Sequence, residues 1–209
     1  MWNVSKVTDP EGGITEYAYD KQKRLIKVKD PLERVVHFTY DPNGNRTKVL
    51  YPDETCMQYT YDAKNRIIKE IDRAGRCTLT EYDGMGNIST VTDNAGNKTR
   101  YAYDACGRKI KETNRNGAVT EYTYTSLGKT ERIVHPDGRI ERYYYGPGGR
   151  LDKHDKGDGT WESYAYDRNA NLIKKTCQDG RTYTYTKSGL EIEMYIDANG
   201  RIISAFPKE

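Results

Sequence analysis

Eight tyrosines of this chain stand at a constant spacing of 21 residues, and no insertion or deletion breaks the register between the first and the last. A short repeat of fixed length indicates one supersecondary unit used many times, with each copy burying its apolar face against its neighbours. The spacing therefore predicts a repeat architecture before any single residue is interpreted. These period-marking tyrosines are Tyr19, Tyr40, Tyr61, Tyr82, Tyr103, Tyr124, Tyr145 and Tyr166.

The apolar inventory is unusual for a chain of 209 residues. It holds 19 Tyr against 2 Phe and 2 Trp, and its mean hydropathy is -0.97. Such a chain cannot build a thick apolar interior. Tyrosine suits a surface that is partly exposed to solvent, because its ring buries apolar area while its hydroxyl keeps a polar partner. A thin, two-faced sheet is the structure that this composition favours.

The charges are balanced and spread evenly, with 34 basic and 31 acidic residues and a net charge of +3. No basic block or tail is present, which argues against nucleic acid as a partner. No apolar run reaches the ~20 residues of a membrane-spanning helix, so we expect no membrane insertion. Residues 1–11 lack the apolar stretch of a signal peptide. If a larger parent protein is exported, its signal lies elsewhere, and folding in the cytoplasm is compatible with this sequence.

Each repeat predicts one β-hairpin. A strand that ends in aromatic-x-Tyr is followed by Asp and, three residues later, by Gly or a substitute. Asp caps a turn through its side chain and Gly accepts a positive φ, so this pattern predicts a four-residue loop. A second strand and a second turn of the Asp-Pro-x-Gly kind follow, which leaves about six to seven residues for each strand. The turn residues singled out here are Asp20, Asp41, Gly44, Asp62, Asp83, Gly86, Asp104, Gly107 and Asp167.

Short turns make consecutive strands antiparallel neighbours, so the chain should be all-β, a single meander of about seventeen strands. Native twist should coil a ribbon of that length into a curved or spiral sheet, a piece of a β-shell. Residues 1–186 form the eight hairpin repeats. Residues 187–209 are atypical, because Tyr185 follows Tyr166 by 19 residues instead of 21. We interpret them as a capping hairpin or as the edge of a longer array.

The loop length also predicts a register and two distinct faces. We expect Tyr19 opposite Arg24, and therefore Tyr17 opposite Ile26 on the same side. One face then carries an aromatic ladder, and the other carries a basic column together with Leu25, Ile67, Ile88, Leu151 and Leu172. The basic column is Lys27, Lys48, Lys69, Lys111, Arg132, Lys153 and Lys174. The ladder tyrosines, which are the candidates for contact with a ligand or enclosed polypeptide, are Tyr17, Tyr19, Tyr40, Tyr59, Tyr61, Tyr101, Tyr103, Tyr122, Tyr124, Tyr143, Tyr145, Tyr164 and Tyr166.

The repeat resembles the RHS or YD repeat. Its pattern, Gly-x-x-x-x-Tyr-x-Tyr-Asp-x-x-Gly-Arg, is visible at residues 96–108, and the resemblance covers about residues 9 to 186. Some copies depart from it, with Thr80 in place of an aromatic residue and Glu33 in place of Gly. The resemblance is to bacterial RHS toxin shells, the shell component of insecticidal toxin complexes and the teneurin YD-shell. It implies a hollow β-shell that encloses a polypeptide, as part of a larger bacterial protein that is secreted or on the cell surface. Residues 189–209 do not resemble the segment that ends such shells, so we expect a part of a shell or a short array.

No residue pattern predicts catalysis, a cofactor or a metal site. His37, His135 and His154 occupy three different phases of the repeat, so we interpret them as ordinary strand residues. The aspartates after tyrosine are explained as turn caps, and no clustered carboxylates of a calcium loop occur. Cys56 and Cys77 should lie two strands apart, about 9.6 Å, beyond the ~7 Å limit for a disulfide. We therefore expect free thiols and a chain that is not an enzyme.

Two classes of function remain open. The first is a structural module, a stretch of shell wall whose partners are further repeats of a parent protein and an enclosed or bound polypeptide. The second is a carbohydrate-binding or cell-wall-binding repeat that stacks exposed tyrosines on sugar rings. Glycan-binding repeats of similar length typically carry Gly-Trp-x-Tyr-Tyr, whereas only Trp2 and Trp161 occur here. The shortage of tryptophan favours the shell wall.

An unclosed meander exposes two strand edges, each with a row of unpaired backbone donors and acceptors. We therefore predict that the isolated chain associates edge to edge into dimers or larger species. Light scattering over a concentration series tests this, and a sharp monomer at high micromolar concentration would contradict it.

Overall fold

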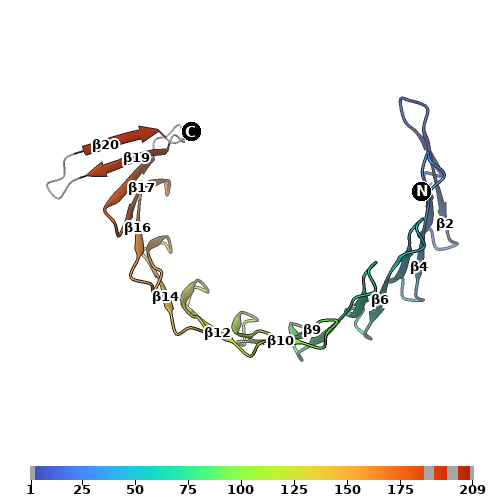
Figure 1. Cartoon of the computed structure of the whole chain (residues 1–209), viewed down its shortest axis with the longest axis horizontal. Coiled ribbons are helices and arrows are strands. Elements are labelled where there is room, and N and C mark those ends of the chain that lie inside the picture. Colours follow the sequence, from blue (N-terminus) through green and yellow to red (C-terminus); the bar gives the residue numbers. More distant parts are fainter. Residues whose placement is uncertain (1–2, 186–190, 197–201, 208–209) are drawn as a thin grey trace. The chain divides into compact units, whose positions relative to one another are not determined.

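The computed structural model describes residues 3–185, 191–196 and 202–207. Every helix or strand assigned among these residues is a β-strand, which confirms the all-β class (Figure 1). The strands recur with the period of the sequence, a strand that ends at a period-marking tyrosine alternating with one that begins after the loop. Their bounds are β1 Lys6–Thr8, β2 Ile14–Tyr19, β3 Leu25–Lys29, β4 Val35–Tyr40, β5 Arg46–Leu50, β6 Cys56–Tyr61, β7 Ile67–Ile71, β8 Cys77–Tyr82, β9 Ile88–Thr92, β10 Lys98–Tyr103, β11 Lys109–Thr113, β12 Val119–Tyr124, β13 Thr130–Val134, β14 Ile140–Tyr145, β15 Leu151–Asp155, β16 Trp161–Tyr166, β17 Leu172–Cys177, β18 Arg181–Tyr185, β19 Glu191–Ile196 and β20 Ile202–Pro207.

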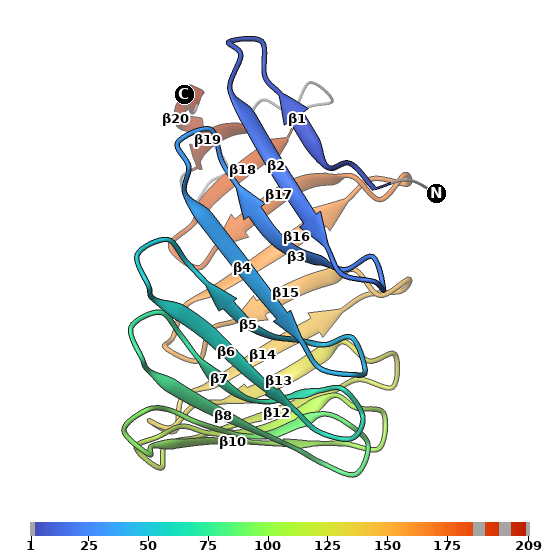
Figure 2. The ribbon, with the colours of Figure 1, turned by 90° about the vertical axis from the view of Figure 1, so that its right-hand side faces the viewer.

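The chain divides into two compact units. Unit 1 comprises Met1–Tyr101 and Asn114–Asn116, and unit 2 comprises Ala102–Thr113 and Gly117–Glu209. In unit 1, the strands from β1 to β10 each pair antiparallel with the next strand in the sequence. Figure 2 shows the strands of this unit lying side by side, joined by loops at both edges. In unit 2, β11 to β20 pair in the same sequential way, which confirms the antiparallel meander within each unit.

The predicted register is wrong, by one residue at Tyr19 and by two at Tyr17, because a β-bulge lies in the hairpin that follows the period-marking tyrosine. In β2 and β3, Tyr17 pairs with Val28 instead of Ile26, and Tyr19 pairs with Leu25 instead of Arg24. The shift lies between Ala18 and Tyr19, and the same shift recurs at the other period-marking tyrosines whose pairing is described within either unit. A bulge places two residues of one strand against one of the other and increases the local twist.

The bulge also corrects the assignment of the faces. Residues that pair directly across two strands share a face of the sheet. Leu25 pairs with Tyr19 and Ile67 with Tyr61, so the aliphatic residues after the loop lie with the ladder and not with the basic column. The same pairing places Ile88, Leu151 and Leu172 opposite Tyr82, Tyr145 and Tyr166. The basic column itself is placed as expected, with Lys27 opposite Ala18 and Lys48 opposite Thr39.

Burial is shallow throughout the described residues. The buried hydrophobic side chains are Val49 and Tyr183, with 4% and 7% of their surface exposed, and no large side chain is fully buried. The buried polar residues are threonines of the sheet: Thr90, Thr92 and Thr182. Strand pairing and contacts at the sheet surface must therefore supply most of the stability that a packed core supplies elsewhere.

The C-terminal region contributes two further strands, β19 and β20, which pair antiparallel. The loop motif that the sequence places at residues 197–201 lies outside the described residues, and the assignment of a cap or cut end at 187–209 stays a prediction. In the part of the chain that the structure describes, no helix has the length and apolar character to cross a membrane.

Candidate functional site

The period-marking tyrosines hold successive repeats together through their hydroxyls. Tyr40 donates a hydrogen bond of 2.9 Å to the carbonyl oxygen of Leu25. Leu25 lies beyond the part of β3 that pairs with β4, whose register ends at Lys27 and His37. The tyrosine hydroxyl thus satisfies a backbone carbonyl that the hydrogen bonds between β3 and β4 leave without a partner. The same bond, always to the carbonyl 15 residues earlier, joins Tyr19 to Val4, Tyr61 to Arg46, Tyr82 to Ile67, Tyr124 to Lys109, Tyr145 to Thr130 and Tyr166 to Leu151.

A cation covers the ring of most of these tyrosines. The guanidinium of Arg24 lies 4.9 Å from the ring centroid of Tyr40, and its Nη1 donates to the carbonyl of Asp41 at 2.9 Å. Guanidinium groups over aromatic faces are attracted by the ring quadrupole. Arg24 therefore links its own loop to the strand end and loop of the next repeat, and the Nη1 atoms of Arg108 and Arg150 likewise reach the next loop, each 3.4 Å from its carbonyl. Equivalent stacking joins Arg66 to Tyr82, Arg108 to Tyr124, Lys129 to Tyr145 and Arg150 to Tyr166.

The turn aspartates accept hydrogen bonds within their own loops. The Oδ1 atom of Asp104 accepts from the backbone N–H groups of Cys106 and Arg108, and its Oδ2 accepts from Nε of Arg108. These bonds, the backbone bond from Arg108 above all, lower the pKa of Asp104 below its usual value. Hydrogen bonds from the residue four positions ahead likewise lower the pKa of Asp20, Asp41, Asp62 and Asp83. The carboxylate of Asp167 accepts from the N–H groups of Asn169 and Asn171.

Glycine serves the same loops through a positive φ. Gly44, Gly86 and Gly107 have φ values of 91°, 96° and 76°, in the left-handed region that side chains rarely adopt. Asn65 and Ala170 occupy the same loop position with φ values of 60° and 71°. The loop therefore tolerates a few residues other than glycine and imposes the same backbone on each.

The remaining ladder tyrosines lie on the same face, two residues before the period-marking ones. They are Tyr17, Tyr59, Tyr101, Tyr122, Tyr143 and Tyr164, and all are half-buried. The hydroxyls of Tyr59, Tyr143 and Tyr164 instead contact the side chain two residues earlier on their own strand. Some of these tyrosine rings are also engaged within the sheet, with Lys109 4.8 Å from the ring centroid of Tyr122 and Arg46 5.8 Å from that of Tyr59.

Sequence reasoning missed a cluster of titratable groups around Glu141 on the ladder face of unit 2. His135 and Arg139 both contact Oε1 of Glu141, the histidine at 3.0 Å, while the hydroxyl of Tyr143 donates to Oε2 at 2.8 Å. Nε2 of His154 lies 3.4 Å from the same Oε2, and its ring stacks on Tyr143 with centroids 4.4 Å apart. Burial alone would raise the pKa of Glu141, but these donors outweigh it and lower the pKa to about 2.

The next repeat contains the same arrangement with different cations. Glu162, 21 residues after Glu141, accepts from the hydroxyl of Tyr164 at 2.6 Å and contacts Lys156 and Lys175 at 3.0 and 3.2 Å. Burial would raise the pKa of Glu162, and the tyrosine and lysines lower it to about 2. Burial, together with the hydrogen bond to Glu162, raises the pKa of Tyr164. A cavity of about 170 Å³ adjoins this group.

The sequence carried a signal for these clusters. Glu141 and Glu162 share one phase of the repeat, and each precedes a ladder tyrosine by two residues. The phase of the histidines along the repeat gives no sign of this cluster, because His154 comes opposite Tyr143 only through the pairing of β14 with β15. Among the described residues, no group of His, Cys, Asp or Glu has the arrangement of a metal site, and all four cysteines are free.

The model of the Teneurin YD-shell family matches residues 2–151 of this chain. The chain belongs to the teneurin YD-shell family. Two solved structures share the fold of this YD-shell chain: TcdB2-TccC3-TEV, with a TM-score of 0.68 and 14% identity, and TcdB2-TccC3-Cdc42, with a TM-score of 0.64 and 15% identity. Both comparisons cover 97% of this chain but only 12% and 15% of the solved chains. A comparison with curated protein sequences gives no match.

Substitution in the loop should cost more stability than loss of a tyrosine hydroxyl. Gly107→Val places a β-branched residue at φ 76° and should lower the free energy of unfolding by about 1–3 kcal/mol. Tyr124→Phe removes the 2.6 Å bond to Lys109 and leaves its carbonyl unpaired, which should cost about 1 kcal/mol. Urea unfolding measures both. Gly107→Asn is the control, because Asn65 adopts this backbone, and equal stability of Gly107→Val and wild type would refute the loop assignment.

The cluster at Glu141 should make stability depend on pH in the acid range. Because the folded pKa is lowered to about 2, its contribution is present above the unfolded pKa of ~4.3 and is lost as the pH falls toward 2. Glu141→Gln should therefore lower the free energy of unfolding by roughly 2 kcal/mol at pH 6, with the difference shrinking below pH 4. Glu131→Gln, at an exposed residue of β13, is the control. A difference that stays constant between pH 6 and pH 2 would contradict the assignment.

Proposed function

We propose that this chain is a stretch of non-catalytic shell wall that encloses or binds a polypeptide. The observation that supports it most is membership of the YD-shell family, together with a fold shared over 97% of the chain with TcdB2-TccC3 structures. The name of one of these solved structures includes Cdc42 together with TcdB2-TccC3, which supports the presence of a further polypeptide beside this fold. We place the parent protein outside the cell or on its surface, with a role in delivery of the enclosed polypeptide.

The contacts of the tyrosines favour a role as shell wall and argue against a role as a sugar-binding module. A sugar that stacks on a protein needs an open aromatic face. The ring of Tyr82 has a guanidinium 4.1 Å from its centroid, and the ring of Tyr40 has one at 4.9 Å. Their hydroxyls are also occupied by backbone carbonyls. The period-marking tyrosines therefore serve the wall itself, and we propose the half-buried Tyr17 and Tyr59 as ladder tyrosines for polypeptide contact.

Binding of an unfolded polypeptide tests this function. A reduced, amide-alkylated and fluorescein-labelled polypeptide of near-zero net charge is titrated with the chain, and anisotropy and protection from protease are measured. Saturable binding is expected, and the double variant Tyr17→Ser/Tyr59→Ser should weaken it about tenfold, because two aromatic contacts are lost. The control is Thr39→Ser/Thr60→Ser, at exposed residues on the opposite face.

The alternative function is tested in parallel on a glycan array. No polypeptide binding, with saturable binding of one glycan class that depends on Tyr17 and Tyr59, would overturn the shell-wall proposal in favour of carbohydrate binding. Failure of both ligands to bind would also contradict it.

A further inference from the structure

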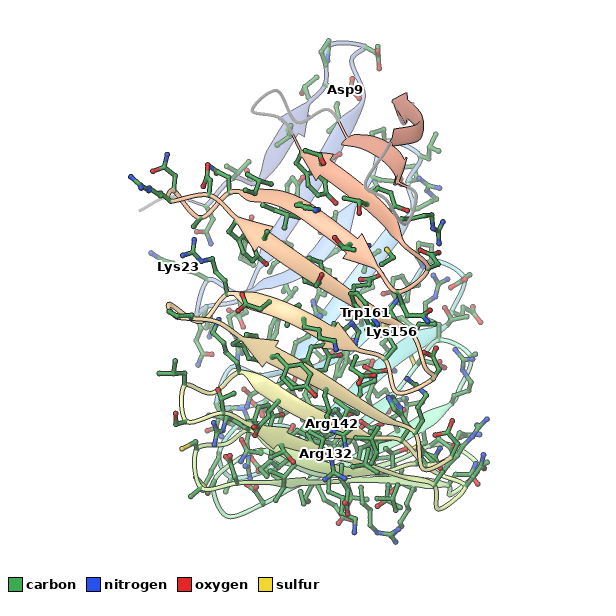
Figure 3. All side chains as sticks on the ribbon, turned by 90° about the vertical axis from the view of Figure 1, so that its left-hand side faces the viewer. Asp9, Lys23, Arg132, Arg142, Lys156 and Trp161 are labelled. Atoms are coloured by element: carbon green, nitrogen blue, oxygen red, sulfur yellow. The ribbon has the colours of Figure 1, made fainter. Side chains whose placement is uncertain are left out.

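Two arginines face each other across strands β13 and β14, on the side of unit 2 that carries the basic column. Arg132 and Arg142 are direct cross-strand partners, and Figure 3 labels them on these neighbouring strands. Like charges directly opposite each other in a sheet repel and destabilise the pairing. A pair of this kind needs an explanation that strand pairing does not supply.

The corresponding positions in the other described repeats never oppose two strong cations. The equivalent pairs each join a basic residue to an acidic residue, a histidine or an uncharged one. They are Lys6 with Glu16, Lys27 with His37, Lys48 with Gln58, Lys69 with Leu79, Arg100 with Thr90, Lys111 with Glu121, Lys153 with Ser163 and Lys174 with Thr184. Arg132 and Arg142 are therefore a local departure from the repeat and not a feature of the fold.

Neither guanidinium finds an acidic partner within the described residues. The ion pairs of unit 2 involve other cations, and Glu121 is paired with Lys111 at 3.9 Å. Asp155 is the cross-strand partner of Arg142 on the other side, but its Oδ1 accepts the backbone N–H of Gly157 at 3.0 Å and makes no ion pair with the arginine. Arg142 is exposed and Arg132 is half-buried. The guanidinium groups of Arg132 and Arg142 thus lie on adjacent strands without an ion-pair partner among the described residues.

Aromatic residues adjoin the pair on the same face. Tyr144, two residues after Arg142, is 47% exposed, and the ammonium of Lys153 lies 5.9 Å from its ring and 5.2 Å from the ring of Trp161. Arginine, tyrosine and tryptophan are the residues most enriched at the centres of protein interfaces. The composition of this surface is that of a binding site for a polypeptide.

We propose that Arg132 and Arg142, flanked by Tyr144 and Trp161, bind an acidic, extended segment of a polypeptide. Each guanidinium can hold a carboxylate through two parallel hydrogen bonds. In an extended peptide, side chains on one side recur every ~6.6 Å, so the long side chains of both arginines can reach successive acidic residues of one peptide. Glu121 and Asp155 on the same face would repel the continuous phosphate backbone of a nucleic acid.

This proposal is independent of the contact between the ladder tyrosines and an enclosed polypeptide, because it concerns the opposite face. The two functions therefore fail separately. Binding of a neutral unfolded polypeptide tests the role of the ladder tyrosines, and binding of an acidic peptide tests the role of Arg132 and Arg142.

The test is titration of a fluorescein-labelled peptide in which Glu alternates with Ser, at physiological salt. Wild type should bind it saturably, and Arg132→Gln/Arg142→Gln should weaken the affinity roughly tenfold or more. The matched control is Lys48→Gln/Lys69→Gln, which removes the same charge from the same column in unit 1 and should change affinity less than about twofold. Equal losses in both double variants would overturn the proposal in favour of general charge attraction.

A charge reversal separates binding from folding. Arg132→Glu should form a cross-strand ion pair with Arg142, and its partner on the other side is the uncharged Thr123, so its thermal midpoint should equal or exceed that of wild type while the acidic peptide no longer binds. Retained binding by this variant, or a fall in its thermal midpoint, would overturn the proposal. So would tighter, arginine-dependent binding of a single-stranded oligonucleotide than of the peptide.

Discussion

The bond from a tyrosine hydroxyl to the carbonyl 15 residues earlier underlies the rest of this structure. Each hairpin carries a bulge after its loop, and the residue at that point, such as Leu25, lies outside the pairing of its strand with the next. Tyr40 reaches back to satisfy the carbonyl. The bond fixes the repeat length, because a shift of one residue would turn the tyrosine to the other face of the sheet.

The loops add a second system of contacts in place of a core. Arg24 pairs with Asp20 of its own loop, stacks on Tyr40 and donates to the carbonyl of Asp41 in the next loop. One side chain therefore joins two hairpins through an ion pair, an aromatic contact and a hydrogen bond. Individually exposed ion pairs contribute little. Their value here lies in repetition, since each loop orders its neighbour and each repeat depends on the one beside it.

The parts of the structure that depend on local sequence could be predicted, and those that depend on strand pairing could not. The 21-residue period, the strands and the Asp and Gly loops follow from side chains within a few positions of each other. The bulge changes the register by one residue, and loop length alone gave no signal of it, so Leu25 was assigned to the wrong face. The cluster at Glu141 was missed for a related reason, because His154 becomes its neighbour only through pairing of β14 with β15.

The shallow burial has a thermodynamic consequence. Unfolding of a protein raises the heat capacity mainly because apolar surface becomes hydrated, while exposure of polar surface lowers it. With Val49 and Tyr183 as the buried hydrophobic side chains of the described residues and threonines buried beside them, little apolar surface is withdrawn from water. The heat capacity change per residue should therefore be small and the stability curve broad. A shell wall built in this way would keep a nearly constant margin of stability across a wide range of temperature.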